Sequence, residues 1–290
     1  MIDGVSPSRQ WLPPGNWNTL LDFLKEHFPF VSTETWLRRM ADGEVVDQTG
    51  SRIDSETPYR EGSCIFYYRE PESEPKIPFE EAIIYEDENI LVADKPHFLP
   101  VTPAGRFLRE TLLVRLRRQS RPDLTPVHRL DRETAGVVLF SLNPTTRGLY
   151  TRLFRERQVQ KVYEALAATS SLDLPVTRRS RLERGEPFFR MREVDGESNA
   201  ETHIEVTDTD AAIREDVQLY RLRPATGKKH QLRVHMAALG IPIVNDRLYP
   251  DHLRSNDDDF SRPLKLIARS LAFVDPVTGQ EQFFESTRSL

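Results

Sequence analysis

The chain has 290 residues and a net charge of −5, a length that suits one large domain and one small one. Apolar residues make up 38% of the chain and are spread along most of it, which excludes wholesale disorder. No apolar run approaches the roughly 20 residues that cross a bilayer, residues 1–10 lack a secretion signal, and the single cysteine, Cys64, excludes an internal disulfide, so we expect a cytoplasmic protein.

The first part of the chain predicts a small module of helices and strands. Apolar side chains recur at helical spacing over residues 20–28, and Ser32 can cap a second short helix. Extended segments are predicted near residues 44–46 and 65–68. We expect residues 1–69 to form this module.

A second, larger unit is predicted after a linker at residues 70–79, which is rich in Pro and Glu and has almost nothing to bury. Its extended segments are predicted at 83–85, 90–93, 137–140, 161–167, 204–206, 219–222 and 271–273. Its helices are predicted at 110–119, 146–157 and 229–239. Short turns join several of the extended segments, so residues 80–290 are expected to be an α+β domain whose mixed, mainly antiparallel central sheet is flanked by helices.

Basic residues are concentrated in two stretches despite the acidic total. Residues 105–132 hold eight arginines against three acids, and residues 147–161 hold five basic residues against Glu156 alone. Such local positive charge is what a nucleic acid would require. Arginines displayed on solvated faces explain the pattern equally well.

Asp131 lies in a polar segment, residues 126–136, that leads into the apolar strand at 137–140. A loop held by a rigid strand is a common position for catalytic groups. Arg129 and Arg132 flank the carboxylate and favour its ionised form, which suits a nucleophile or base. The alternative is an ordinary surface ion pair, which contributes little energy.

A second basic segment begins with a turn at Gly227 and runs into the predicted helix at 229–239. Lys228 and Lys229, together with backbone N–H groups at the helix start, form a credible phosphate site. Arg233 lies one turn further and can face the same site.

Two other features have simple alternatives. His230 and His235 are five residues apart and point to diverging helix faces, so we expect no metal site. Tyr163 sits in a predicted strand with its ring opposite Val162 and Glu164. A core tyrosine with a bonded hydroxyl is the alternative for this residue.

Together these segments resemble the RluA-type pseudouridine synthases, which rearrange uridine in ribosomal or transfer RNA. The central motif of that family, His-Arg-Leu-Asp followed by two residues and Thr-Ser-Gly, stands here at residues 128–136, with Ala135 in place of Ser. Further motifs of the family are similar, in order, to residues 94–96, 161–163, 226–235, 240–243 and 246–249. The departures are Ala135, Lys228 for Arg, Asn245 for Gly, and Ile267 where His is frequent.

The resemblance implies a pseudouridine synthase fold and an isomerase that needs neither cofactor nor metal. It assigns the catalytic carboxylate to Asp131, which would attack the ribose or the ring, or assist an elimination. It makes Tyr163 the residue that stacks on the base and Arg233 the partner of Asp131. Arg129 is the candidate to fill the gap that a flipped uridine leaves. The residues expected to contact RNA are His128, Arg129, Arg132, Thr134, Lys161, Lys228, Lys229, His230 and Gln231.

Residues 1–69 resemble a diverged RNA-binding module of the ribosomal-protein-S-four type, with a packing extension as the alternative. We expect RNA as the partner, no membrane, no required protein partner, and a monomer. One competing function is a non-catalytic RNA-binding or ribosome-assembly factor. The other is a glycosidase or nucleoside hydrolase, which would need a second acid. Glu133 is the nearby candidate for that acid.

Overall fold

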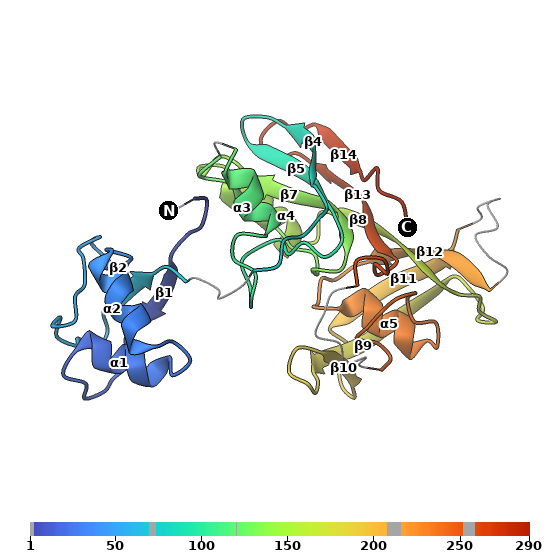
Figure 1. Cartoon of the computed structure of the whole chain (residues 1–290). Helices are drawn as coiled ribbons and strands as arrows, with labels where there is room; N and C mark the ends of the chain where they lie inside the picture. Colours follow the sequence, from blue (N-terminus) through green and yellow to red (C-terminus); the bar gives the residue numbers. More distant parts are fainter. Residues whose placement is uncertain (1–2, 70–73, 120, 208–215, 252–258) are drawn as a thin grey trace. The chain divides into compact units, whose positions relative to one another are not determined.

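The computed structural model describes residues 3–69, 74–119, 121–207, 216–251 and 259–290, which form two compact units, Met1–Glu74 and Pro75–Leu290 (Figure 1). Residues 70–73 of the predicted linker lie outside the described residues. None of the helices in these described ranges is long and apolar enough to cross a membrane.

The smaller unit packs two helices on a three-stranded antiparallel sheet in the order β1-β3-β2. Its elements are β1 (Ser8–Trp11), α1 (Leu20–His27), α2 (Thr33–Ala41), β2 (Val45–Asp47) and β3 (Cys64–Tyr67). Ser32 caps α2 as predicted, since its hydroxyl accepts a hydrogen bond from the Thr35 N–H. Phe23, Leu24 and Trp36 are fully buried and form the centre of its core.

The larger unit is built on one sheet, to which the described residues contribute eleven strands. The main order is β10-β9-β11-β12-β8-β13-β7-β5-β4, with β14 paired to β13 and β6 paired to β7. Of the described pairings, β7–β13 is parallel and the others are antiparallel, which confirms the predicted mixed, mainly antiparallel sheet. The strands are β4 (Ala82–Glu86), β5 (Ile90–Lys95), β6 (Thr125–Pro126), β7 (Ala135–Ser141), β8 (Gln160–Ala168), β9 (Val176–Arg184), β10 (Met191–Val194), β11 (Ala200–Val206), β12 (Val217–Pro224), β13 (Leu266–Val274) and β14 (Glu281–Glu285).

The described residues of this unit also form three helices: α3 (Leu112–Arg117), α4 (Arg147–Arg155) and α5 (Gln231–Ala238). In Figure 1, α3 and α4 lie beside the β5 and β7 part of the sheet, and α5 lies beside β9 to β11. The predicted helix at 229–239 starts later than expected because His230 adopts a left-handed backbone conformation with φ 55°. Thr111 caps α3 and so ends the predicted helix at 110–119 on its N-terminal side.

Strand β13 joins the two halves of the sheet because it lies between β7 and β8. One hydrophobic cluster lies on the β5 and β7 side and includes Leu91, Leu112 and Val138. A second lies on the β8 and β12 side and includes Met236 from α5. Tyr163 packs against both clusters and therefore sits at the junction.

Gly136 is required where β7 approaches β13. Its φ is 112°, which disfavours any other residue, and an added Cβ would lie 2.2 Å from the carbonyl oxygen of Ala268. The glycine at the end of the 128–136 motif therefore permits the close pairing that places the preceding loop against the rest of the sheet.

The end of the predicted linker needs a correction. Ile77 is 1% exposed and belongs to the core of the larger unit. Its N–H donates to the Glu110 carboxylate, and the Arg115 guanidinium donates to the carbonyls of Ile77 and Phe79. The linker was predicted from its Pro- and Glu-rich composition, which does not show that Ile77 is buried.

Candidate active site

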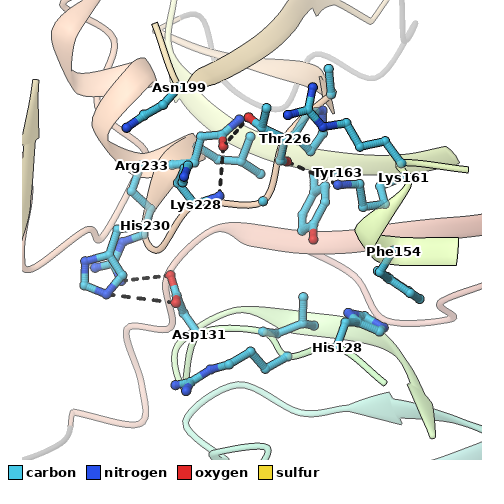
Figure 2. Close-up of a pocket in the computed structure, with 18 of the residues that line it drawn as sticks. His128, Asp131, Phe154, Lys161, Tyr163, Asn199, Thr226, Lys228, His230 and Arg233 are labelled. Carbon is cyan, nitrogen blue, oxygen red and sulfur yellow. Dashed lines mark hydrogen bonds and ion pairs between the residues drawn. The ribbon is translucent and has the colours of Figure 1, made fainter. Parts of the chain in front are cut away.

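A cavity of about 780 Å³ opens in the larger unit between the loop before β7, strand β8 and the start of α5. Asp131, Tyr163 and Arg233 all line it (Figure 2). The three segments singled out in the sequence are therefore brought together at one site.

The Asp131 carboxylate is half-buried and faces α5. Its Oδ2 lies 3.8 Å from Nη1 of Arg233, and its Oδ1 lies 3.9 Å from Nε2 of His230. The sequence predicts Arg129 and Arg132 as its cationic neighbours, but Arg132 instead pairs with Glu133 at 2.9 Å. The cation beside Asp131 thus comes from α5, a segment far along the chain.

Arg233 is held chiefly by Asp246 and only secondarily by Asp131. Its Nε and Nη2 donate to the two oxygens of Asp246 at 2.8 and 2.7 Å, and both side chains are buried. Its remaining nitrogen, Nη1, is buried and makes no hydrogen bond to any part of the chain that the structure describes. It lies 3.6 Å from Glu133 as well as near Asp131. Asp246 lies in the 246–249 motif, but its contact with Arg233 could not be read from the sequence.

Burial opposes the charged form of Arg233, but the hydrogen bonds to Asp246 and the charges of Asp246, Glu133 and Asp131 outweigh it and raise the pKa of the guanidinium. Arg233 therefore remains a cation throughout the working pH range. Asp246 fixes its orientation and leaves one N–H edge directed at the acids of the loop.

His230 faces Asp131 as a neutral ring. Burial lowers its pKa, despite the opposing charge of Asp131. Its Nδ1 lies 2.9 Å from the hydroxyl of Tyr249, which also accepts a hydrogen bond from the Met191 N–H.

Tyr163 projects from β8 into the cavity (Figure 2). Burial and, secondly, the Asp131 charge raise the pKa of its phenol above the ordinary value. The hydroxyl therefore stays protonated at neutral pH. It can donate a hydrogen bond or a proton, and it is not a resting phenolate base.

Glu133 does not line the cavity. Burial opposes its ionisation, but the guanidiniums of Arg233 and Arg132 outweigh burial and lower the pKa of the carboxyl to about 2. Glu133 is consequently ionised at neutral pH and has no proton to give.

The other residues predicted to bind RNA divide into two groups. Most line the cavity, namely His128, Arg129, Thr134, Lys161, Lys228, His230 and Gln231. Arg132 and Lys229 do not: Arg132 turns to Glu133, and Lys229 donates to the carbonyl of Phe189. These two side chains therefore contact partners outside the cavity lining, and their contact with RNA stays a prediction.

Two lining residues are occupied by internal contacts. The Gln231 side chain accepts from the Thr226 hydroxyl and the Lys228 N–H, and it donates to the Glu201 carbonyl and the Thr202 hydroxyl. It therefore fastens the start of α5 to β11 and has no free group for RNA.

His128 likewise serves the fold. Its Nε2 accepts from the Leu139 N–H at 3.0 Å, and its ring stacks on Phe154 with centroids 4.4 Å apart. Burial lowers the pKa of the imidazole to about 3, so the ring is neutral. His128 positions the loop that carries Asp131.

Positive charge is concentrated on the cavity lining, where seven Lys and Arg residues face two acids. Arg129, Arg157 and Lys228 make no side-chain hydrogen bond or ion pair within the described ranges. Sequence reasoning did not single out Arg157, whose left-handed backbone (φ 59°) places it at the end of α4. A positive φ is uncommon outside glycine and frequent at functional positions.

The two basic stretches contribute unequally. Of the eight arginines in residues 105–132, Arg129 alone is on the cavity lining, whereas Arg115 and Arg121 pair with Glu110 and Glu86 elsewhere in the unit. From residues 147–161 the contributors are Arg155, Arg157 and Lys161. The first stretch is therefore mainly structural and the second mainly lines the site.

No group of three or more His, Cys, Asp or Glu side chains in the described part of the chain could hold a metal ion. His235 is buried, with Nδ1 near the Thr202 hydroxyl and Nε2 near the Ser180 hydroxyl, so both of its ring nitrogens are used inside the fold.

Comparison with known proteins identifies the class. Residues 89–238 match the family model described as RNA pseudouridylate synthase. The matched region contains Asp131, Tyr163 and Arg233. The chain therefore belongs to the RNA pseudouridylate synthase family, and it is an isomerase that acts on RNA.

Individual relatives confirm the RluA-type resemblance. The chain is 34% identical over 218 residues to the dual-specificity RNA pseudouridine synthase RluA of Vibrio vulnificus, covering 70% of this chain and 80% of that protein. It is 29% identical over 311 residues to an uncharacterized RNA pseudouridine synthase of Aquifex aeolicus, covering 97% and 93% of the two chains. The solved structure of human RNA pseudouridylate synthase domain containing 1 is similar with a TM-score of 0.60 and 27% identity, covering 74% of this chain and 86% of that one.

Proposed function

We propose that this protein converts specific uridines of ribosomal or transfer RNA to pseudouridine, with Asp131 as the catalytic carboxylate. The observation that carries the proposal is the convergence of Asp131, Tyr163 and Arg233 on one cationic cavity. A volume of about 780 Å³ is of the size that ligand pockets generally have, and it admits one extruded nucleotide.

The reaction is an isomerisation. The bond from ribose C1′ to N1 of uracil breaks, a bond from C1′ to C5 forms, and the proton lost from C5 is balanced by one gained at N1. No electron is transferred and no group is added or removed. The carboxylate of Asp131 acts at the reacting nucleotide, and the Arg233 guanidinium opposite it balances its charge and fixes its orientation.

The remaining roles follow from position. The Tyr163 ring supplies a face for the flipped base, and its protonated hydroxyl supplies a hydrogen bond. Arg129 is exposed at the edge of the cavity and is assigned to the gap that the base leaves in the RNA. Arg157 and Lys228 carry the uncompensated charge that phosphates require.

The competing functions are less well supported. A two-carboxylate hydrolase needs a second group that can donate a proton, and Glu133, with its pKa held near 2, cannot do so. The hypothesis of a non-catalytic RNA-binding factor does not explain why the buried Asp246 carboxylate positions Arg233 beside Asp131.

The direct test compares Asp131→Asn with Asp123→Asn, a matched change at an exposed residue outside the cavity. RNA labelled with tritium at C5 of uridine releases the label when C5 bonds to ribose. Wild type and Asp123→Asn are expected to release tritium, and Asp131→Asn is expected to release none while keeping the wild-type circular dichroism spectrum and RNA affinity. Tritium release at the wild-type rate by Asp131→Asn would remove this residue from the mechanism.

We also propose that residues 1–69 bind RNA, that residues 80–290 carry out catalysis, and that the protein acts as a cytoplasmic monomer. All three central groups of the site come from one chain. Cys64 is a buried free thiol, as suits a reducing compartment. Sedimentation of the active protein tests the monomer, and a dimeric active species would contradict it.

A further inference from the structure

The hairpin formed by β9 and β10 ends in a tip that exposes an aromatic side chain. Phe188 is 81% exposed, and its ring meets the ring of Phe189 edge-on, with centroids 5.6 Å apart. Phe189 is half-buried and anchors the tip. Both faces of so exposed a ring are free to stack on a flat ligand group.

The tip is fastened to the elements that build the active site. The Lys229 ammonium donates to the Phe189 carbonyl at 2.7 Å, and the Met191 N–H donates to the Tyr249 hydroxyl at 2.7 Å. The Arg190 guanidinium lies over the Tyr249 ring, 5.0 Å from its centroid. Tyr249 also contacts His230, a residue of the cavity lining, and Lys229 lies directly before α5. These contacts fix the position of Phe188 relative to the cavity.

The surroundings of the tip are positively charged. The Lys229 ammonium interacts electrostatically with the guanidiniums of Arg129 and Arg184 and with Asp131. Arg184, the last residue of β9, has no side-chain hydrogen bond or ion pair in the described ranges. By contrast, Arg178 and Arg181 on the same strand pair with Glu193 and Glu183. Cations thus extend from the cavity to the tip, which also carries one acid, Glu186.

We propose that this hairpin tip is a docking surface for the RNA segment beside the target uridine, with Phe188 stacked on a neighbouring base and Arg184 and Lys229 facing phosphates. The inference rests on the proposed function, which supplies RNA as the ligand. Aromatic stacking accepts any base, and phosphates match the positive charges of Arg184 and Lys229. An apolar protein surface would instead leave these cations without a counter-charge.

The experiment measures RNA affinity by fluorescence anisotropy, using a labelled RNA stem-loop that contains uridine and has single-stranded flanks. Phe188→Ala and Phe188→Leu are expected to weaken binding by about 5- to 150-fold, the loss typical of one stacked base, and Phe188→Trp is expected to keep the wild-type affinity. Phe283→Ala is the matched control, because Phe283 is 64% exposed on β14. Arg184→Ala is expected to reduce the slope of log affinity against log salt by about one.

The proposal is overturned if Phe188→Ala binds this RNA within about twofold of Phe283→Ala, which is also the outcome if the tip serves a protein partner. The Leu and Trp variants separate stacking from folding, since only Trp restores a ring. Tritium release by the wild type tests the proposed function independently. If the wild type releases tritium and Phe188→Ala binds RNA normally, the RNA contact of the hairpin is refuted and the proposed function stands. If Phe188→Ala weakens RNA binding but the wild type releases no tritium, the RNA contact is supported and the proposed function is refuted.

Discussion

Replacing Asp246 by asparagine is expected to destabilise the larger unit by about 3–5 kcal/mol, the usual loss when one partner of a buried ion pair is removed. The Asp246 carboxylate receives both hydrogen bonds of the Arg233 fork, and its Oδ1 also accepts from the N–H groups of Leu248 and Tyr249. Asparagine has only one side-chain oxygen to accept these hydrogen bonds, and its NH₂ group would face the remaining donors. The Arg233 guanidinium, 1% exposed, would then remain buried with its main counter-charge gone.

Urea denaturation measures this change, and the chain supplies an internal reference. Trp11, Trp17 and Trp36 are the three tryptophans of the sequence, and all lie in the smaller unit. Tryptophan fluorescence therefore follows the smaller unit, whereas far-ultraviolet circular dichroism is dominated by the large sheet. The substitution is expected to shift the dichroism transition and to leave the fluorescence transition in place.

The matched control is Glu183→Gln, which removes one partner of an exposed pair with Arg181 and is expected to cost about 0–1 kcal/mol. In tritium release, Asp246→Asn is expected to lower kcat more than it raises KM, because Arg233 loses its orientation toward Asp131. A destabilisation below about 1 kcal/mol, with kcat unchanged, would show that Asp246 does not hold Arg233 in the way described.

Three further changes test other parts of the structure. Tyr163→Phe is expected to bind RNA nearly as tightly as the wild type and to lose tritium release; an unchanged rate would make Tyr163 an ordinary core residue. For Glu133, the folded-state pKa lies below the ordinary value of 4.5, so its contribution to stability is present above pH 4.5 and is lost as the pH falls toward about 2. Glu133→Gln is therefore expected to remove up to about 3 kcal/mol of pH-dependent stability, and urea melts of both proteins across that window with identical pH dependence would contradict this. Gly136→Ala is expected to prevent normal folding because its Cβ would meet the Ala268 carbonyl, whereas Gly148→Ala in α4, where nothing lies within 4 Å, is expected to stabilise the protein by about 0.5–1 kcal/mol. Soluble expression and thermal melts check this pair, and equal behaviour of the two variants would contradict it.

The elements that the sequence predicted are those with one clear burial pattern. Strands β5 and β7 are buried along their whole length, and α1 and α2 present periodic apolar faces with polar caps. Strands β9 and β10 were not predicted, because charged residues occupy both of their faces. Their pairing is supported by contacts such as Arg178 with Glu193, which exist only once the strands are adjacent.

For the candidate site, the sequence predicted the central residues but not most of their charge partners. The motifs located Asp131, Tyr163 and Arg233, since each stands in a short segment with its own residue pattern. Their charge partners were not predictable from chain neighbours, because tertiary packing decides which guanidinium reaches which carboxylate. Asp246, rather than Asp131, is the group that hydrogen-bonds Arg233.

The place of β13 in the sheet makes the site depend on a strand that holds none of its three central residues. The loop with Asp131 belongs to the half that contains β7, whereas Tyr163 and Arg233 belong to the half that contains β8 and α5, and β13 is inserted between β7 and β8. A substitution that disrupts β13 is therefore expected to separate Asp131 from Tyr163 and Arg233, although all three residues remain in the chain.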